Sequence, residues 1–392
     1  MNFTIIPKKN GLENVDGFFF DGKCAGFKKD EPDVGFIYSD NPCRVSAVFT
    51  TNKFMASPIK HFKRYGQNFE TNFIFLNSKN ANAMTGEKGV EDIDEILSYI
   101  DLPLKNPIMS STGVIGYRLD IDRFKKVIKE FDFSSKNSDA VARAIMTTDS
   151  FKKELALEVT LSDGKKFNIA SIAKGAGMIN PAMATMLCFV LTDSDIPKED
   201  MDELLKEAVD ESFNKISVDG DTSTNDTVML LTSAKNPYHK EAFKEALNFI
   251  LFELSQMILR DGEGANKVVA FEVKGAKSVE EAKRASKALS NSLLVKTALF
   301  GEDPNWGRIA STIGASGVEC DEDTLEIYYD ELLIYGKDKR ELDSDTEEKA
   351  YNIMRQDSFK ITCNLNIGKG SYTSYGCDLS YEYVKINAEY RT

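Results

Sequence analysis

The chain has 392 residues, of which 42% are hydrophobic and 28% are charged, a balance typical of globular proteins that bury a large core. Lysine and arginine total 49 against 62 aspartates and glutamates, which gives a formal net charge of −13 at pH 7. An acidic surface of this kind repels phosphate backbones and anionic membranes, so we expect no nucleic-acid partner.

Strands and helices are predicted along the whole chain. Nine segments have the β-branched or aromatic composition of strands: 45–50, 73–76, 156–161, 167–173, 186–192, 228–232, 268–273, 324–329 and 359–365. Apolar residues follow helical spacing over 201–213 and 243–257. Ser278 and Glu281 match a capping box, which predicts a third helix there. This alternation predicts the α/β or α+β class.

A polar stretch at 233–240 separates a predicted strand from a predicted long helix and contains Pro237. Domain boundaries fall in such exposed, polar connections. We therefore predict two domains, 1–236 and 237–392.

The chain shows no sign of a membrane segment or a signal peptide. Its longest apolar run, 246–259, is interrupted by Asn248, Glu253 and Gln256, so it is too short to span a bilayer. The N-terminus lacks the apolar core of a secretory signal. We expect a cytoplasmic protein that inserts into no membrane.

Residues suited to metal or nucleotide binding are sparse. The six cysteines form no C-x-x-C pair, and we interpret them as reduced thiols. His61 and His239 each stand beside a lysine, which leaves little material for a histidine triad or metal site. The stretch 219–226 begins like a calcium loop but lacks its glycine and glutamate, and no complete nucleotide fingerprint is present. We predict no metal and no organic cofactor.

The most unusual segment runs from Lys174 to Leu187 with the sequence KGAGMINPAMATML. A glycine-rich turn leads through Pro181 directly into a predicted buried strand, an arrangement able to strain the peptide between Ala184 and Thr185. The same pattern also suits a plain connection in which Thr185 only begins a strand. The local pattern leaves both interpretations open.

Further blocks give this segment a context. They are SAVFTTN (46–52), NSKNANAMTG (77–86), SSTGVIG (110–116), IMTTD (145–149), SVDGDTSTNDT (217–227), RDGEGA (260–265) and GEDPNWGRI (301–309). In order and spacing they resemble the ornithine acetyltransferases, also called glutamate N-acetyltransferases, and KGAGMINPAMATML resembles that family's self-cleavage signature. Two departures are Lys79, where many members carry glycine, and Thr392, where some carry serine.

The resemblance implies a fold and a processing step. The expected fold is a layered αββα sandwich of the self-cleaving N-terminal-nucleophile type with a second, smaller α/β domain, whose C-terminal tail returns to the active site. Cleavage between Ala184 and Thr185 would yield an alpha chain, 1–184, and a beta chain from 185. A freed α-amine titrates at about 7.7 to 8.0, so it can take the proton of the Thr185 hydroxyl without a histidine.

The resemblance also implies the reaction and its residues. Thr185 is the expected nucleophile, which takes acetyl from N2-acetyl-L-ornithine and passes it to L-glutamate in the cyclic arginine pathway. Thr112 and Gly113 are the expected oxyanion hole. The substrate-binding residues expected from the family are Thr147, Lys174, Thr185, Glu263, Asn387 and Thr392. The neighbour Thr148 remains an alternative to Thr147.

Three alternatives stay open. A self-cleaving aminopeptidase or amidase on a similar scaffold would hydrolyse the acyl-enzyme if water reached it. A bifunctional enzyme would also accept acetyl-CoA as donor. A non-catalytic α/β protein would use the glycine turn only structurally. Family resemblance further implies that the alpha and beta chains stay associated as a heterotetramer with two copies of each.

Overall fold

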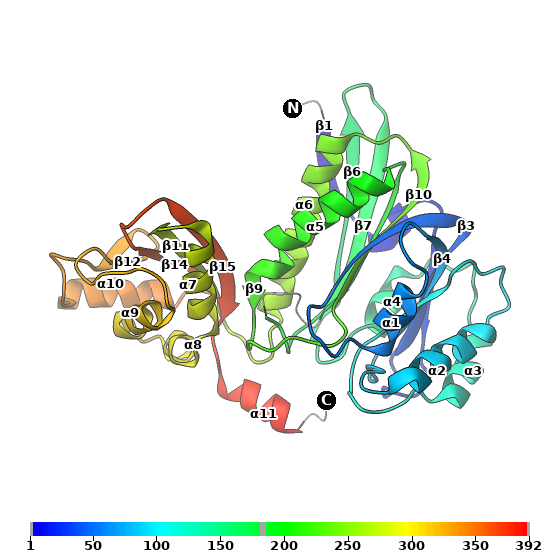
Figure 1. The fold of residues 1–392 in the computed structure, drawn as a ribbon, viewed down its shortest axis with the longest axis horizontal. Helices are drawn as coiled ribbons and strands as arrows, with labels where there is room; N and C mark the ends of the chain where they lie inside the picture. Colours follow the sequence, from blue (N-terminus) through cyan, green and yellow to red (C-terminus); the bar gives the residue numbers. More distant parts are fainter. Residues whose placement is uncertain (1–2, 181–185, 390–392) are drawn as a thin grey trace.

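The computed structural model describes residues 3–180 and 186–389. Its strands form two sheets that lie side by side, each with helices packed on it (Figure 1). The strands of the larger sheet are β1 Phe3–Lys8, β2 Phe19–Lys23, β3 Val34–Phe49, β4 Glu70–Asn77, β5 Ile108–Ser111, β6 Lys153–Leu161, β7 Lys166–Lys174, β8 Leu187–Ser194 and β10 Thr227–Asn236. Those of the smaller sheet are β9 Ile216–Ser217, β11 Val268–Ala276, β12 Glu326–Tyr329, β13 Leu332–Tyr335, β14 Ser358–Asn364 and β15 Gly370–Cys377.

The helices fall into an N-terminal and a C-terminal group. Before residue 262 they are α1 Ser57–Lys63, α2 Gly86–Ser98, α3 Ile121–Ile128, α4 Ser138–Ala144, α5 Lys198–Glu211 and α6 Lys240–Arg260. After it they are α7 Val279–Asn291, α8 Leu293–Phe300, α9 Trp306–Ala315, α10 Ser344–Met354 and α11 Tyr381–Glu389. The predicted cap of α7 is present, since the Ser278 side chain accepts the Glu281 N–H at 3.2 Å.

The larger sheet folds over on itself. Its strand order is β1-β6-β7-β8-β10-β3-β4-β5, with β2 paired to β3. The register of β3 against β4 shifts between Tyr38 and Cys43, which divides this long strand into two halves. The first half pairs with β2 and the second half pairs with β10. Ile37 and Ile74 of the folded-over half share a buried cluster with Ala170 and Phe189, so the two halves face each other.

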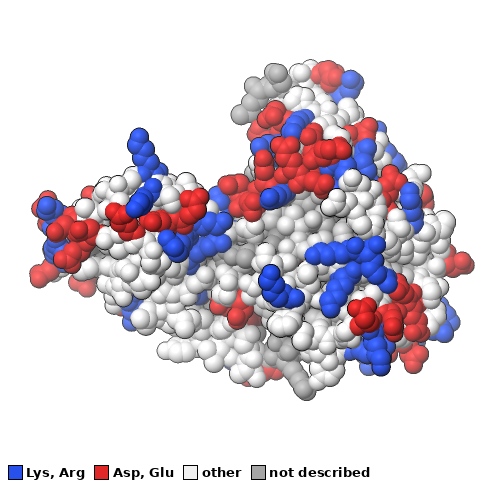
Figure 2. All heavy atoms as spheres, viewed as in Figure 1, with Lys and Arg blue, Asp and Glu red and all other residues white. Residues whose placement is uncertain are grey.

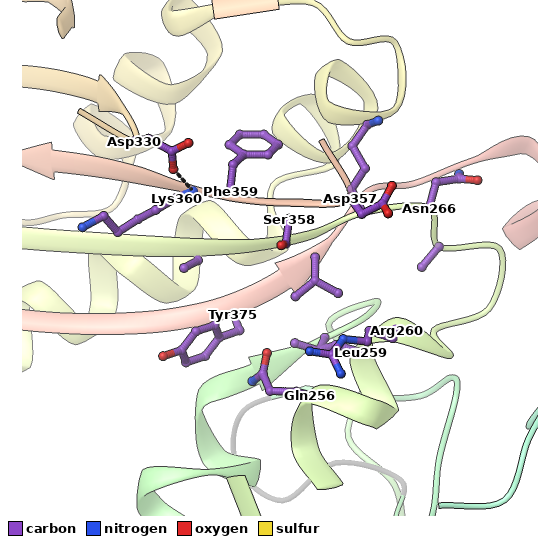
Figure 3. A pocket seen from close by; sticks show the side chains of 14 residues that line it. Gln256, Leu259, Arg260, Asn266, Asp330, Asp357, Ser358, Phe359, Lys360 and Tyr375 are labelled. Carbon is purple, nitrogen blue, oxygen red and sulfur yellow. Dashed lines mark hydrogen bonds between the residues drawn. The ribbon is translucent and has the colours of Figure 1, made fainter. Parts of the chain in front are cut away.

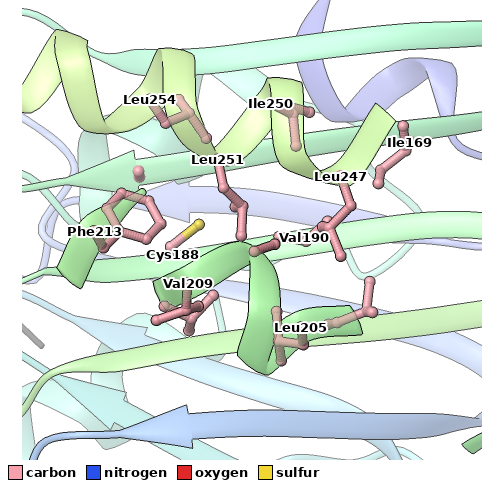
Figure 4. Close-up of a cluster of buried hydrophobic side chains, with 14 of the residues drawn as sticks. Ile169, Cys188, Val190, Leu205, Val209, Phe213, Leu247, Ile250, Leu251 and Leu254 are labelled. Atoms are coloured by element: carbon pink, nitrogen blue, oxygen red, sulfur yellow. The ribbon is translucent and has the colours of Figure 1, made fainter. Parts of the chain in front are cut away.

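Three buried clusters therefore separate four layers. Helices α5 and α6 cover the outer face of β7 and β8, where Leu205, Leu251 and Val190 meet (Figure 4). The next cluster lies between the two halves of the sheet. In the third, α2 and α3 cover the outer face of β3 and β4. Successive β8 residues alternate between the first two clusters, as a strand requires. The order is helix, sheet, sheet, helix, which confirms the predicted α/β class and αββα sandwich.

The smaller sheet has the order β13-β12-β14-β11-β15-β9. Apolar side chains of α7, α9 and α10 pack with those of β11, β12 and β14 into a separate core. Strand β9 joins the two parts of the molecule, because it follows the α5 region in sequence and pairs with β15 in parallel. The C-terminal strand is thereby held next to the larger sheet's connections.

The predicted division at residue 236 stays a prediction, and the packing of α6 bears on it. Phe243, Leu247 and Leu254 of α6 belong to the cluster shared with β7 and β8. A helix that completes the core of the first domain belongs to that domain. We therefore propose that the first domain continues to Arg260 and that the second begins with the connection to β11.

Charge is unevenly spread over the surface. Acidic side chains gather where α5 and α6 are exposed, and the face around the remaining elements is more mixed (Figure 2). Helix α5 alone, with the sequence KEDMDELLKEAVDE, carries most of its charge as Asp and Glu. This acidic face is the structural counterpart of the −13 net charge.

Candidate active site

Thr112 and Gly113 follow directly after β5, at the end of the folded-over half of the larger sheet. The Thr112 N–H donates to the Asn77 carbonyl at 3.1 Å, and the Thr112 side chain is buried. Gly113 has a φ of +132°, and a Cβ there would lie 2.3 Å from the Lys79 carbonyl carbon. Only glycine fits this close approach between two backbone segments. Lys79 itself has a φ of +69°, a conformation that favours glycine.

Lys174 is the last residue of β7, and its side chain is 2% exposed. Its ammonium nitrogen lies 4.0 Å from Oδ2 of Asp149. Burial lowers the pKa of Lys174, and Asp149 partly opposes this effect. Burial by itself would raise the pKa of Asp149, but Lys174 and Lys153 hold it well below its ordinary value. Asp149 is therefore an anion deep inside the protein.

The glycine turn after β7 lies against Glu263. A Cβ on Gly177 would lie 2.4 Å from Glu263 Oε2, so the turn needs glycine here for space, while Gly175 has a φ of +153°. Met178 follows with a φ of +56°, and Asp219 holds it by accepting its N–H at 2.6 Å. Strained backbone of this kind persists only where the surroundings impose it.

The C-terminal helix reaches this point from the smaller sheet, because α11 follows β15 in the chain. On α11, the side-chain amide of Asn387 donates to Glu263 Oε2 at 2.7 Å. The Tyr383 hydroxyl donates to Asp219 at 3.3 Å. Gly264, with a φ of +70°, lets the α11 backbone approach, since a Cβ there would lie 2.6 Å from the Tyr383 nitrogen. The structure thus places the end of the described chain beside the glycine turn.

One cavity of about 70 Å³ joins these features. Its lining residues are Thr112, Gly113, Ile115, Thr147, Thr148, Lys174, Gly177, Met178, Ser223, Thr224, Asn225, Glu263 and Asn387. Six residues singled out from the sequence are among them, drawn from five separate chain segments. Thr147 and Thr148 both line the cavity, so the choice between them remains open.

Ala184, Thr185 and Thr392 lie outside the described residues. The described residue next to Thr185 is Met186, whose N–H donates to Asp226 Oδ1 at 3.0 Å. Burial raises the pKa of Asp226 well above its ordinary value. Asn225, which lines the cavity, donates to the Ala81 and Ser111 carbonyls at 2.7 and 2.8 Å. Residue 186 is therefore anchored to the same loop that forms one wall of the cavity.

Sequence reasoning assigned no individual role to Asp149, Asn225 or Asp226. All three lie in the blocks IMTTD and SVDGDTSTNDT, so the blocks were a usable signal. His61, which stands beside a lysine in the sequence, is buried with its Nε2 3.1 Å from Asp94. Among the described residues, no group of three or more His, Cys, Asp or Glu side chains is arranged to hold a metal.

A larger cavity of about 640 Å³ lies elsewhere, between the end of α6 and the strands β11, β14 and β15 (Figure 3). Arg260, Tyr375 and Lys360 are among its lining residues. It contains none of the residues singled out from the sequence. The larger volume therefore does not identify the candidate site. We choose the small cavity because residues singled out from the sequence line it.

Comparisons with known proteins identify the family of the chain. Residues 19–392 match the ArgJ family. The arginine biosynthesis bifunctional protein ArgJ of Wolinella succinogenes is 56% identical over 100% of both chains. The glutamate N-acetyltransferase of Methanocaldococcus jannaschii is 42% identical over 94% of this chain and 96% of its own. A crystal structure of the bifunctional protein from Bacillus halodurans is 39% identical and covers 52% of this chain and 98% of its own, with a TM-score of 0.47.

The family match and the Wolinella and Methanocaldococcus relatives define an enzyme of the acyltransferase class that acts in arginine biosynthesis. The chain belongs to the ArgJ family. The resemblance seen in the sequence blocks is thereby confirmed. Over the described ranges, no helix is both long and apolar enough to cross a bilayer. The cytoplasmic location stays a prediction.

Proposed function

We propose that this acyltransferase cuts itself between Ala184 and Thr185 and then carries acetyl from N2-acetyl-L-ornithine to L-glutamate on Thr185. The observation that carries the proposal is the convergence of Thr112, Gly113, Thr147, Lys174, Glu263 and Asn387 on one cavity. Met186, the neighbour of Thr185, is tied to a wall of that cavity through Asp226 and Asn225. The name of the Methanocaldococcus relative supports the same acceptor.

The cleavage step needs only the chain itself and water. The Thr185 hydroxyl oxygen attacks the Ala184 carbonyl carbon, the acyl group moves from nitrogen to oxygen, and the nitrogen gains a proton. Water then hydrolyses the resulting ester, which leaves a carboxylate on Ala184 and a free amine and hydroxyl on Thr185. The freed amine, with a pKa of about 7.7 to 8.0, acts as the base that a histidine supplies elsewhere.

The transfer step proceeds in two halves. Thr185 attacks the acetyl carbonyl of N-acetylornithine and releases ornithine, and the glutamate amine then attacks the acetyl ester. Both attacks place negative charge on the carbonyl oxygen, which the Thr112 hydroxyl and the Gly113 N–H stabilise. A single donor of this kind typically contributes about 2.7 to 4 kcal/mol to the transition state.

Two charged side chains suit the substrates. Lys174, a buried cation at the cavity wall, pairs with the α-carboxylate that ornithine and glutamate share. Glu263, held by Asn387, faces the distal ammonium of ornithine. Thr147 and the tail residue Thr392 complete the proposed set of substrate contacts.

The name of the Wolinella relative favours a second donor. Because that protein is called bifunctional and is 56% identical, we propose that acetyl-CoA also acetylates Thr185. Steady-state rates with acetyl-CoA in place of N-acetylornithine test this point. Absence of N-acetylglutamate would restrict the enzyme to the ornithine cycle.

Intact mass spectrometry of the wild type beside Thr185→Ala tests self-cleavage. The wild type should give two chains that divide at residue 184, and the variant should remain near 43.7 kDa. An uncleaved wild type would overturn the proposal and favour a structural role for the glycine turn. In a parallel assay with N-acetylornithine, formation of N-acetylglutamate should depend on glutamate. Acetate release that is indifferent to glutamate would instead indicate an amidase or aminopeptidase.

A further inference from the structure

Four buried charges lie behind the wall of the small cavity. They belong to Asp149, Lys153, Lys174 and Asp261, and none of their side chains is more than 3% exposed. Of these, only Lys174 lines the cavity. Taking two cations and two anions out of water is costly unless they are closely paired, so their arrangement needs a reason.

Lys153 connects the two carboxylates. It is the first residue of β6, and its Nζ donates to Asp149 Oδ1 at 2.7 Å and also to Asp261. Lys174 is farther from Asp149, at 4.0 Å. Asp149 therefore makes its short contact with Lys153 through Oδ1, and Lys174 makes only the longer contact with Oδ2.

The two carboxylates hold the segments that carry the cavity residues. Asp149 accepts the Thr147 N–H at 3.0 Å and the Gly175 N–H at 2.7 Å. Asp261 accepts the Ser150 N–H at 3.1 Å. Two residues after Asp261, the Glu263 N–H donates to the Ala176 carbonyl at 2.8 Å. Three separate segments thus meet around one lysine that does not line the cavity.

We propose that Lys153 is a positioning residue: by engaging Asp149 and Asp261, it keeps the Lys174 ammonium available for the substrate carboxylate and holds Thr147 and Glu263 in place. The proposal rests on the function proposed above, in which the α-carboxylate of ornithine or glutamate pairs with Lys174. Lys153 acts through its neighbours, because it lies outside the cavity lining.

The charges that face Lys174 determine the direction in which its pKa should shift when Lys153 is replaced. The loss of solvent is the largest influence and lowers the pKa of Lys174; Asp149, Glu263 and Asp226 raise this pKa, whereas Lys153 lowers it further. Removing the Lys153 charge leaves Lys174 as the one cation paired with Asp149 among the described residues. The pKa of Lys174 then rises, and Lys174 becomes less available to substrate.

Lys153→Met is the first test. We expect the KM for glutamate to rise about tenfold, the size of one lost charge-assisted contact. Activity that depends on protonated Lys174 falls at high pH, which gives the pH–activity profile an alkaline limb. In Lys153→Met this limb should move to higher pH by about one unit. If Lys153 had only a structural role, its replacement would lower the amount of folded enzyme without moving the alkaline limb.

Asp261→Asn is the second test and predicts the opposite sign. It removes an anion from Lys153, so the region around Lys174 becomes more positive and the alkaline limb should move to lower pH. Lys152→Met is the matched control, because Lys152 pairs with Asp139 and Glu154 near the surface. Its limb should coincide with that of the wild type. Lys153→Arg should restore most of the wild-type KM.

Mass spectra of all variants establish that each is cleaved before its rates are compared. Suppose that the wild type transfers acetyl and that Lys153→Met and Asp261→Asn both have the wild-type alkaline limb. This outcome would overturn the proposed role of Lys153 and leave the proposed function standing. If Lys153→Met does not fold, an unmoved limb in Asp261→Asn does the same. A wild type without acetyl transfer overturns the proposed function and this inference together.

Discussion

At the scale of single residues, space around Glu263 is the most sensitive feature of the candidate site. A methyl group on Gly177 would fall 2.4 Å from Glu263 Oε2 and 2.5 Å from Cδ, and Gly177 has no positive φ that would strain an alanine. Gly177→Ala should therefore displace the carboxylate with little change in the backbone. We expect the KM for N-acetylornithine to rise about tenfold, with a smaller change for glutamate, in initial-rate assays.

Gly314→Ala is the matched control for this substitution. Gly314 lies in α9, and a Cβ there would meet nothing within 4 Å. An exposed helical glycine costs about 1 kcal/mol relative to alanine, so the control should be slightly more stable and kinetically unchanged. Equal KM values for Gly177→Ala and the wild type would show that Glu263 does not bind the ornithine ammonium.

At the scale of elements, α11 serves the site more than it serves stability. Among its described side chains none is buried, yet Asn387 and Tyr383 contact Glu263 and Asp219. Ending the chain after Ser380 should therefore change the melting temperature by no more than about 2 °C. The same truncation should raise the KM for both substrates. A large loss of thermal stability with unchanged KM would contradict this division of roles.

The elements also show what a sequence can predict. Strands β6, β7, β8 and β10 were predicted because their central positions read as β-branched or aromatic runs, and they are buried on both faces. Strand β15, with the sequence GSYTSYGC, was missed because its glycines and serines are typical of turns. Its pairing with β11 compensates for that composition. The register shift within β3, which creates the sandwich, coincides with the exposed turn-forming residues Asp40, Asn41 and Pro42, which did not lead to a prediction.

The candidate site was predictable in the same uneven way. Lys174 and Glu263 came from the family resemblance, since charged residues are by default expected on the surface. Lys153 was not predicted, because a lysine at the start of a strand is usually solvated, whereas here the nearby Asp149 and the distant Asp261 neutralise it. Partners separated by more than 100 residues become visible only in the folded chain.

At the scale of the whole molecule, the strand order determines how fragments cut at residue 184 would behave. The fragment that begins at 185 contributes β8 and β10 to the larger sheet, and both lie between strands of the other fragment. β8 pairs with β7 from Leu187 to Thr192, and β10 pairs with β3 from Thr227 to Thr232. Two strand pairings, β7 with β8 and β10 with β3, would therefore join the fragments by backbone hydrogen bonds. They lie on either side of the inserted pair β8 and β10.

The fragments should consequently stay together after cleavage and separate only when the whole fold is lost. Parting them would break both ladders and expose side chains such as Phe189 and Leu231, each worth about 1.5 to 3 kcal/mol when buried. Size exclusion with light scattering should show both fragments in one peak, at twice the 43.7 kDa of one chain if two copies of each assemble as the family resemblance implies. Thermal unfolding should follow a single transition for the larger sheet, and denaturant should release both fragments over the same range. Elution of either fragment alone under native conditions would mean that the inserted strands are held less firmly than their position between two ladders requires.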